Sequence, residues 1–359
     1  MPFHRPSTAD VAPAPVEAPD RPGLSDLERA ILLTVLYADL FDYPLTRDEL
    51  YRRLVETPCD RAAFERALDD LVPAYLDRAS SYLTWAGRTH LADVRTYRLE
   101  MTEDLWQTAR RYARWLARIP FVRMVAVSGS LAVNNAEAKS DVDFFCITTP
   151  NRLWLARAWI VPLSKLTGWF PKAFPLYLCP NYILALDELH VEDHNLFTAH
   201  EVAQTVPLWG LDVYRRFLQA NRWVYDFLPH TRFDDHLHRA MPPPRPWFTR
   251  GAERLLRGRM GDALDRLIYR LFLTFYRRRA ERAGWNWARL QQAYRRNRYT
   301  VPEGGYARVI YRLFVRRVRE RLGAQVSKSN LARIFALPDD ESVQDNYDWA
   351  ELFARDYGV

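Results

Sequence analysis

The sequence predicts an α+β protein with a helical N-terminal unit, a central mixed sheet flanked by helices and a helical C-terminal part. Short helices with capping residues come first, and apolar runs with the spacing of β-strands occupy the middle of the chain. Amphipathic, arginine-rich segments follow the linker signal Pro242-Pro243-Pro244. A length of 359 residues accommodates two or three domains of ordinary size.

Composition excludes several classes of protein. Hydrophobic residues make up 48% of the chain, which is too many for a disordered protein. The cysteines Cys59, Cys146 and Cys179 form no CxxC pair and have no histidines at zinc-ligand spacing, so we expect no structural zinc and a cytoplasmic location. No segment has the roughly 18–20 uninterrupted apolar residues of a membrane span, so we expect no membrane partner. Residues 1–23 lack the apolar core of a secretory signal and predict a disordered tail.

Residues 24–100 predict three helices followed by a β-hairpin. The first helix ends at Phe41-Asp42-Tyr43-Pro44, because the residue before a proline avoids the helical conformation. Thr46 and Asp60 cap the second and third helices, which extend to residues 54 and 71. An extended segment at 82–85, a turn at 86–88 and a second extended run to residue 99 predict the hairpin. This order predicts a winged-helix domain, a class used for DNA reading or for protein interaction. The acidity of the third helix disfavours DNA reading.

Residues 101–240 predict the central domain. A helix over 102–119 precedes an apolar strand at 122–127, and further strands are expected at 141–148 and 176–186. Between these last two strands lies a helix over 152–166 that Pro162 is expected to kink. Helices follow from residue 193. Strands that alternate with helices predict a mixed sheet covered by helices.

Two short motifs in this domain carry chemistry. In the first, an apolar strand runs into Ser128-Gly129-Ser130, where glycine permits a close approach of the backbone to a phosphate and a following helix start offers free amides. In the second, Asp141 and Asp143 are two residues apart on a strand and are expected on one face, while the intervening Val142 enters the opposite core. Two adjacent carboxylates predict a site for a hard cation such as Mg²⁺.

These motifs resemble the polymerase-beta-like nucleotidyltransferase superfamily, whose signature is an apolar strand, Gly-Ser, about ten residues and Asp-apolar-Asp. The resemblance covers roughly residues 122–186. It implies that Asp141 and Asp143 bind Mg²⁺ or Mn²⁺, that Ser128, Gly129 and Ser130 hold the triphosphate of an NTP, and that an unidentified acceptor attacks the α-phosphorus. Lys139 and Ser140 are further candidates for phosphate contact, with capping of a turn as the alternative.

A broader resemblance extends over most of residues 24–210. The arrangement of a winged helix before this core is similar to that of bacterial nucleotidyltransferase-domain proteins. Three further segments contribute to the likeness: Asn151-Arg152-Leu153-Trp154, Cys179-Pro180-Asn181-Tyr182 and Phe197-Thr198-Ala199-His200-Glu201. The resemblance implies no particular acceptor.

The chain departs from the superfamily at the third carboxylate. On the third strand the matching position is assigned to Asn181, which can coordinate a metal but cannot accept a proton. Asp187 and Glu201 are the alternatives for this role. The departure keeps a second interpretation open, in which the protein is a catalytically weak nucleotide sensor or nucleic-acid-binding protein on the same fold.

Residues 241–359 predict an arginine-rich helical domain. Between residues 239 and 321 the chain has 22 arginines, no lysine and six acidic residues, a local charge of +16. Arginines alternate there with Trp285, Trp287, Tyr294 and Tyr299, a pattern that suits phosphate contact and base stacking. Nucleic acid is therefore a possible partner. The alternative is a solvated arginine face on ordinary amphipathic helices.

Overall fold

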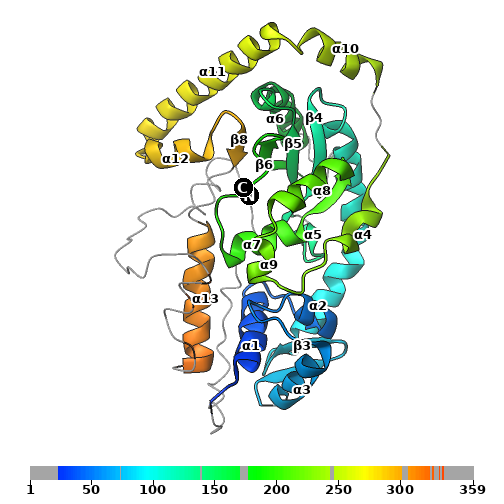
Figure 1. The fold of residues 1–359 in the computed structure, drawn as a ribbon, viewed down its shortest axis with the longest axis vertical. Helices are drawn as coiled ribbons and strands as arrows, with labels where there is room; N and C mark the ends of the chain where they lie inside the picture. The colour runs from blue at the N-terminus through cyan, green and yellow to red at the C-terminus, as the bar shows by residue number, and fades with distance from the viewer. Residues whose placement is uncertain are drawn as a thin grey trace.

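The structure is a computed structural model that describes residues 23–72, 74–137, 140–169, 177–242, 246–300 and 306–323, with the single residues 326, 331 and 334. A small unit with its own sheet adjoins a larger unit built on a five-stranded sheet (Figure 1). The expected α+β class with a mixed sheet flanked by helices is confirmed. Within the described ranges, no helix is long and apolar enough to cross a membrane.

The first unit has three short helices and a three-stranded antiparallel sheet of order β1-β3-β2. Its elements are α1 (Asp26–Asp39), β1 (Leu45–Thr46), α2 (Arg47–Arg52), α3 (Arg61–Leu71), β2 (Leu76–Ala79) and β3 (Tyr82–Trp85). The expected caps are present, because Thr46 forms a capping box with Glu49 and the Asp60 side chain accepts a hydrogen bond from the Ala63 amide.

The predicted hairpin is wrong in its second half. Tyr82–Trp85 does form a strand, but it pairs with the preceding Leu76–Ala79 rather than with residues 88–99. The latter residues begin the 26-residue helix α4 (Leu91–Leu116). Arg95 and Arg98 on this helix are buried and reach back to the backbone oxygens of Pro44 and Asp42, so tertiary contacts stabilise the helix here. Helix α4 also crosses the expected domain boundary at residue 100.

The central sheet has the order β7-β4-β5-β6-β8. Strands β5 and β6 are parallel, and the other neighbours are antiparallel. The elements of this part are β4 (Val122–Val127), α5 (Gly129–Ala132), β5 (Val142–Thr148), α6 (Leu153–Trp169), β6 (Leu178–Ala185), α7 (Leu196–Gln204), β7 (Val206–Trp209), α8 (Leu211–Ala220), α9 (Val224–Phe227) and the 3₁₀ helix η1 (Asp234–Arg239). Pro162 lies inside α6, as expected.

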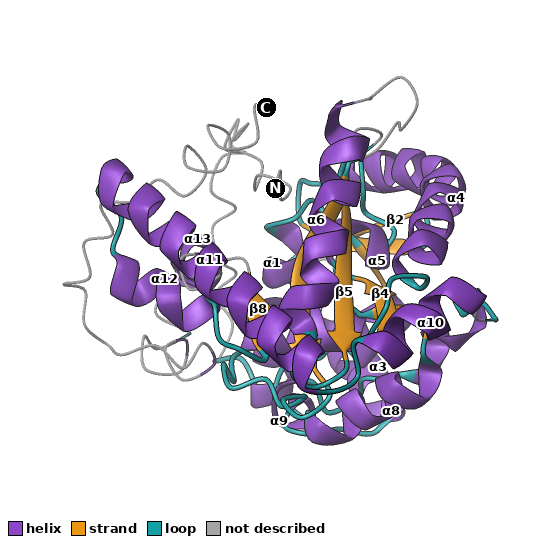
Figure 2. Ribbon diagram, turned by 90° about the horizontal axis from the view of Figure 1, so that it is seen from above, coloured by secondary structure: helices purple, strands orange, loops and turns teal. Residues whose placement is uncertain are grey.

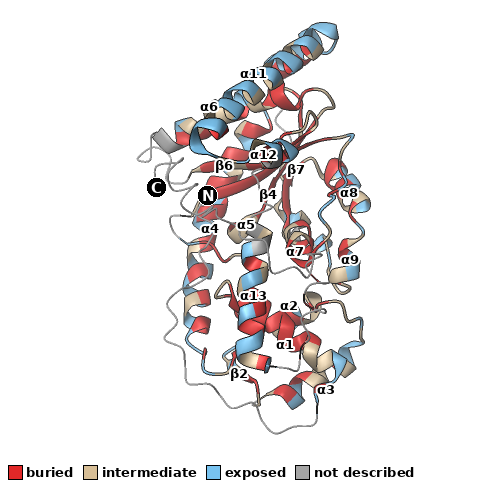
Figure 3. Cartoon of the chain, turned by 90° about the vertical axis from the view of Figure 1, so that its left-hand side faces the viewer, coloured by how far each residue is buried: buried red, intermediate tan, exposed pale blue. Residues whose placement is uncertain are grey.

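Helices cover both faces of the sheet (Figure 2). On β5, Val142 and Phe144 join the core that contains α4 and α6, whereas Phe145 and Ile147 join the core that contains α1, α7 and α8. The strands are buried almost throughout, while the outer surface of α11 is exposed (Figure 3). Period-two alternation therefore assigns Asp143 to the face shared with α1 and α7.

Most C-terminal elements that the structure describes contribute side chains to the two cores beside the central sheet. They are α10 (Trp247–Leu255), α11 (Arg259–Ala283), α12 (Trp287–Ala293), β8 (Arg298–Thr300) and α13 (Tyr306–Leu322). Strand β8 pairs with β6, and Phe314 of α13 contacts Tyr37 of α1. The sequence pattern predicts neither β7 nor β8, because short edge strands have too few residues to show alternation.

Two sets of contacts fix the C-terminal helices to the body. Arg152 donates hydrogen bonds to the backbone oxygens of Leu256 and Gly258 and pairs with Asp262 at the start of α11. The buried Asp39 of α1 binds Arg88, and it also binds Arg317 of α13. Arg152, which belongs to the segment Asn151-Arg152-Leu153-Trp154, thus connects the start of α6 to the start of α11.

Candidate functional site

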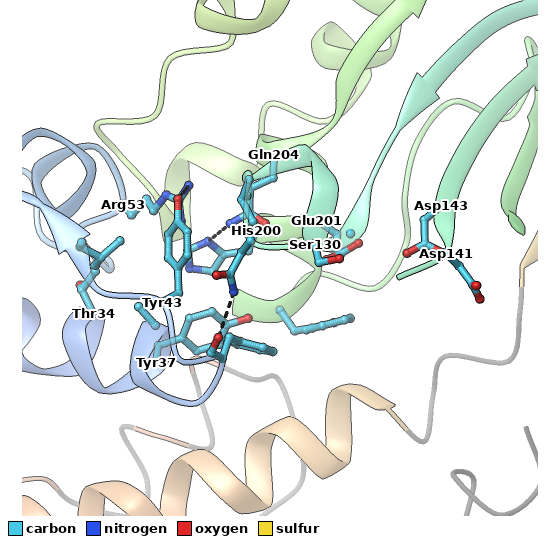
Figure 4. Close-up of a pocket in the computed structure, with 17 residues that line it drawn as sticks. Thr34, Tyr37, Tyr43, Arg53, Ser130, Asp141, Asp143, His200, Glu201 and Gln204 are labelled. Atoms are coloured by element: carbon cyan, nitrogen blue, oxygen red, sulfur yellow. Dashed lines mark hydrogen bonds between the residues drawn. The ribbon is translucent and has the colours of Figure 1, made fainter. Parts of the chain in front are cut away.

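A cleft of about 880 Å³, part of it open to solvent, lies where the first unit meets the sheet (Figure 4). We call it the acidic cleft, since Asp141, Asp143 and Glu201 all line it. Its walls come from α1 and the loop after it, from Arg53 directly after α2, and from the single-turn helix α5, the start of β5 and α7. The remaining lining residues are Thr34, Tyr37, Ala38, Phe41, Tyr43, Leu45, Arg53, Gly129, Ser130, Val133, Asn135, Phe197, His200 and Gln204.

The glycine-serine turn packs directly against the second aspartate. The Ser128 amide donates a hydrogen bond of 3.0 Å to the backbone oxygen of Asp143 across the β4–β5 pair. Gly129 has a φ of +68°, and a Cβ atom there would lie 2.4 Å from Asp143 Oδ2. Only glycine leaves room for the carboxylate at this point. The turn and Asp143 therefore meet, as the motif predicts.

Asp141 is less constrained than Asp143. Strand β5 begins at Val142, whose amide donates to the Tyr177 oxygen at 2.9 Å, so Asp141 lies just outside the ladder. Both aspartates line the acidic cleft. In Figure 4, however, the Asp143 carboxylate is directed toward Ser130 and Glu201, whereas that of Asp141 turns away from them. The two side chains lie in one cleft, as predicted, but their carboxylates point in different directions.

The three carboxyl groups of the cleft resist ionisation. Burial raises the pKa of Asp143 well above its usual range, and the neighbouring Asp141 and Glu201 raise it further. Burial also raises the pKa of Asp141 to about 6 and that of Glu201 to about 7. A buried carboxyl group that neighbouring acids repel favours the binding of a cation, which removes the repulsion.

The side chains of the cleft supply only some of the ligands that a magnesium ion requires. Carboxylate oxygens suit Mg²⁺ or Mn²⁺, and Asp143 Oδ1 is buried without a hydrogen-bond partner. Over the described ranges, no three His, Cys, Asp or Glu side chains are grouped so that they could hold a metal ion. The residues therefore fit an ion that takes its other ligands from water and from substrate phosphates.

Strand β6 does not supply the third carboxylate. Cys179, and not Asn181, is in register with Asp143, and the register shifts between the Phe144 and Phe145 pairs, where Asn181 is the extra residue. Asn181 is buried and is not among the residues that line the acidic cleft. The sequence could not reveal this shift, because a bulge changes which residues face each other without changing their order.

Helix α7 brings a further carboxyl group, that of Glu201, to the acidic cleft. Its N-cap is Asn195, whose side chain accepts from the Thr198 amide. Helical spacing then brings one face to the cleft, with Phe197, His200, Glu201 and Gln204 in its lining. Asp187, the other alternative for this role, is exposed at the end of β6 and binds Asn297.

The remaining predicted phosphate contacts are placed less favourably. Ser140 closes a turn, since its hydroxyl accepts from the Glu137 amide at 2.9 Å, and it does not line the cleft. Ser128 is buried and is also absent from the lining. Lys139 lies outside the described residues. Helix α5 is a single turn, so any phosphate seat at Gly129 and Ser130 depends on individual amides rather than on a long helix dipole.

Several lining residues were not predicted from the sequence. Tyr37 lies in α1, Tyr43 in the loop after α1 and Arg53 directly after α2, all within the first unit. They are ordinary residues of a small helical unit, and no local pattern distinguishes them. Only the packing of that unit against α5 and α7 brings them to the cleft.

The aromatic residues of the C-terminal part are used in packing. Tyr294 and Tyr299 are buried and stack on each other with ring centroids 5.7 Å apart. Trp285 and Trp287 are partly buried against the same core. The four rings are therefore not arranged as an exposed platform for nucleic-acid bases.

No protein-family model matches the chain, and neither a curated protein nor a solved structure does. The likeness to nucleotidyltransferases therefore depends on the motif residues and their geometry alone.

Because the pKa of Glu201 is raised, we expect the free energy of unfolding of the metal-free protein to fall as the pH rises. The pKa is about 7 in the folded protein against an ordinary 4.5, so the folded state holds a proton that the unfolded chain releases. This contribution to stability is full below pH 4.5 and is lost as the pH rises through 7. His200, whose pKa burial lowers to about 3, acts in the opposite sense below pH 6.5.

A Glu201→Gln variant isolates this effect because it retains His200. In EDTA we expect the variant to gain stability relative to wild type by on the order of 2 kcal/mol between pH 5 and pH 8. Urea unfolding followed by circular dichroism measures the difference. A difference that does not change with pH would show that Glu201 ionises as freely in the folded protein as in the unfolded chain.

Proposed function

We propose that the protein is a metal-dependent nucleotidyltransferase that moves a nucleoside monophosphate from an NTP to an acceptor hydroxyl. The observation that carries the proposal is the contact between Gly129 and the Asp143 carboxylate, in a cleft that Asp141 and Glu201 also line. A tight backbone turn beside acidic groups joins the two requirements of phosphoryl transfer, which are a seat for phosphates and ligands for a cation.

Asp141 and Asp143 would hold Mg²⁺ or Mn²⁺. When bound, the ion neutralises charge on the transferred phosphate. The backbone of Gly129 and Ser130 would orient the triphosphate, and a bond would then form between the acceptor oxygen and the α-phosphorus while the bond to the leaving pyrophosphate breaks. Positioning supplies much of the acceleration in such reactions.

Glu201 would take the proton of the acceptor hydroxyl. It lines the same cleft as Asp143, from the opposite wall (Figure 4). Its pKa of about 7 suits a general base near neutral pH, whereas Asn181 could not accept a proton in any case. The third carboxylate of the proposed site would thus come from helix α7 rather than from the third strand.

Replacement of Glu201 by glutamine is expected to lower kcat about 100-fold, because the general base is lost. NTP binding should change little. The rise of the wild-type rate through about pH 7 should disappear in the variant, which a merely structural role for Glu201 would not produce. Steady-state kinetics from pH 5.5 to pH 9 make the comparison, and an unaltered pH profile would contradict the assigned role.

The activity itself is tested with each labelled NTP in the presence of Mg²⁺ or Mn²⁺. Release of pyrophosphate, or label on the protein or on an added acceptor, is the expected result. Absence of turnover with all four nucleotides and with both metals, across a panel of hydroxyl acceptors, would count against the proposal.

A second candidate function is nucleotide sensing without efficient turnover. It is favoured by Cys179, which occupies the position in register with Asp143 where a carboxylate would complete the strand-based site. Burial, followed by the charge of Asp143, raises the pKa of the Cys179 thiol well above its usual range. This candidate predicts thermal stabilisation by NTP without formation of product.

We also propose that the first unit is a winged helix. The order α1-β1-α2-α3-β2-β3 and the sheet order β1-β3-β2 support this assignment. Its third helix has Glu65 and Asp69 paired with Arg47, so this acidic surface is unsuited to a DNA groove. The unit instead contributes a wall to the acidic cleft.

A further inference from the structure

A second cleft adjoins the acidic one and has the opposite charge. It has a volume of about 910 Å³, part of it open to solvent, and lies between α2, the end of α5, α7, the segment after α9 and η1. We call it the cationic cleft, because Arg52, Arg53, Arg232 and Arg239 line it. Of its described lining residues, Glu49 is the one acid.

That one acid interacts with Arg53 of the cleft and with Arg95 outside it. Glu49 binds Arg95, which does not line the cleft, at 2.5 Å, and accepts a hydrogen bond from the Tyr43 hydroxyl at 2.9 Å. Arg239 stacks over Trp106 and lies 3.9 Å from the Glu103 carboxylate. Burial and the nearby Arg110 lower the pKa of Arg239. The cleft therefore retains an excess of positive charge, which favours an anionic ligand.

His200 provides a second, independent indication of a ligand. It is 5% exposed and lines both clefts, together with Arg53 and Gln204. Its pKa of about 3 keeps the ring neutral at physiological pH. The Gln204 amide nitrogen lies 3.3 Å from Nδ1, so Nδ1 accepts and the ring proton is on Nε2. Nε2 is buried without a hydrogen-bond partner.

The two clefts meet at α5. Gly129 and Ser130 at its start, with Val133 and Asn135 after its end, line the acidic cleft, whereas Ala132 and Asn134 line the cationic one. A ligand in the cationic cleft would therefore lie beyond the glycine-serine turn. It could still contact His200 and Arg53, because these two residues line both clefts, and His200 directly precedes Glu201.

We propose that the cationic cleft binds a phosphate group carried by the acceptor, which extends from there toward Glu201. Arginine forms charge-assisted hydrogen bonds with phosphate, often two at a time, and several arginines in one cleft suit a doubly charged phosphate monoester. The role as acceptor site rests on the proposed function, whereas anion binding by the cleft does not.

The test is direct binding, measured by calorimetry on the full chain without turnover. The probes are glycerol phosphate, a short single-stranded oligonucleotide without a terminal phosphate, and a non-hydrolysable NTP analogue with Mg²⁺. In the double variant Arg52→Gln/Arg232→Gln, affinity for glycerol phosphate or for the oligonucleotide should fall about tenfold or more, while that for the NTP analogue stays unchanged. Arg222→Gln, an exposed arginine outside the cleft, is the matched control.

The outcomes separate this proposal from the function on which it partly rests. Loss of glycerol phosphate binding supports a phosphate monoester, and loss of oligonucleotide binding alone supports a phosphodiester source. Equal weakening of the NTP analogue would assign the cleft to the triphosphate and overturn the proposal, as would no binding of either probe to wild type. If the protein bound the anionic probes and did not bind the NTP analogue, the anion site would be supported and the proposed nucleotidyltransferase activity would be contradicted.

Discussion

Replacement of Asp143 by asparagine is expected to lower the rate of nucleotidyl transfer at least about 1000-fold. The side chain keeps its size, but the charge that would hold the cation beside the glycine-serine turn is lost. Stabilisation of the transferred phosphate by a metal ion contributes several kcal/mol, and each 1.4 kcal/mol is a factor of about ten in rate. Steady-state assays with Mg²⁺ and the preferred NTP measure the loss.

The same substitution should make the metal-free protein more stable. Asp143 is buried, and the carboxylates of Asp141 and Glu201 raise its pKa. Its neutral analogue should increase the free energy of unfolding by about 1 kcal/mol at pH 8 in EDTA. Loss of activity with a gain in stability distinguishes a functional carboxylate from a structural one. A variant that is both inactive and less stable would argue for a structural role.

Asp187→Asn is the matched control for this pair of measurements. Asp187 is an aspartate at the exposed end of β6, where it accepts a hydrogen bond from Asn297, and it does not line the acidic cleft. Its replacement should change the rate by less than a factor of about two. The free energy of unfolding should stay within about 0.5 kcal/mol of that of the wild type. A large loss of rate in this variant would mean that the site extends to the other end of the strand.

Replacement of Gly129 by alanine is expected to remove most of the activity and to destabilise the fold by about 2–4 kcal/mol. Gly129 has a φ of +68°, and a Cβ atom at this position would lie 2.4 Å from Asp143 Oδ2. Either the turn or the carboxylate must move, and each movement separates the phosphate seat from the metal ligand. Thermal unfolding and the NTP assay measure the two effects.

Gly251→Ala serves as the control for the loss of a glycine. Gly251 lies inside α10, and nothing is within 4 Å of a Cβ atom built there. Because alanine favours the helix, this variant should be equal to wild type or more stable by up to about 1 kcal/mol. If Gly129→Ala were as active and as stable as Gly251→Ala, the close contact with Asp143 could not be essential.

The part of the site that the sequence predicts is the part that local geometry controls. Gly129 and Asp143 were predicted from a turn and from alternation, and both features depend on a few consecutive residues. Asn181 was assigned by counting along a strand, and a bulge in β6 places Cys179 in register with Asp143 instead. Counting fails there because the bulge arises from how two strands pair.

The sequence by itself determined the caps at Thr46 and Asp60, the strands on either side of the glycine-serine turn and the side of the sheet to which Asp143 belongs. Hydrogen bonds and steric limits within a few residues fix these features. Only the tertiary structure decided that helix α7 completes the acidic cleft, that β7 and β8 extend the sheet and that arginines from distant segments share a second cleft. Those contacts join segments far apart in the chain, which meet because burial of their apolar faces stabilises the whole arrangement and not any one segment.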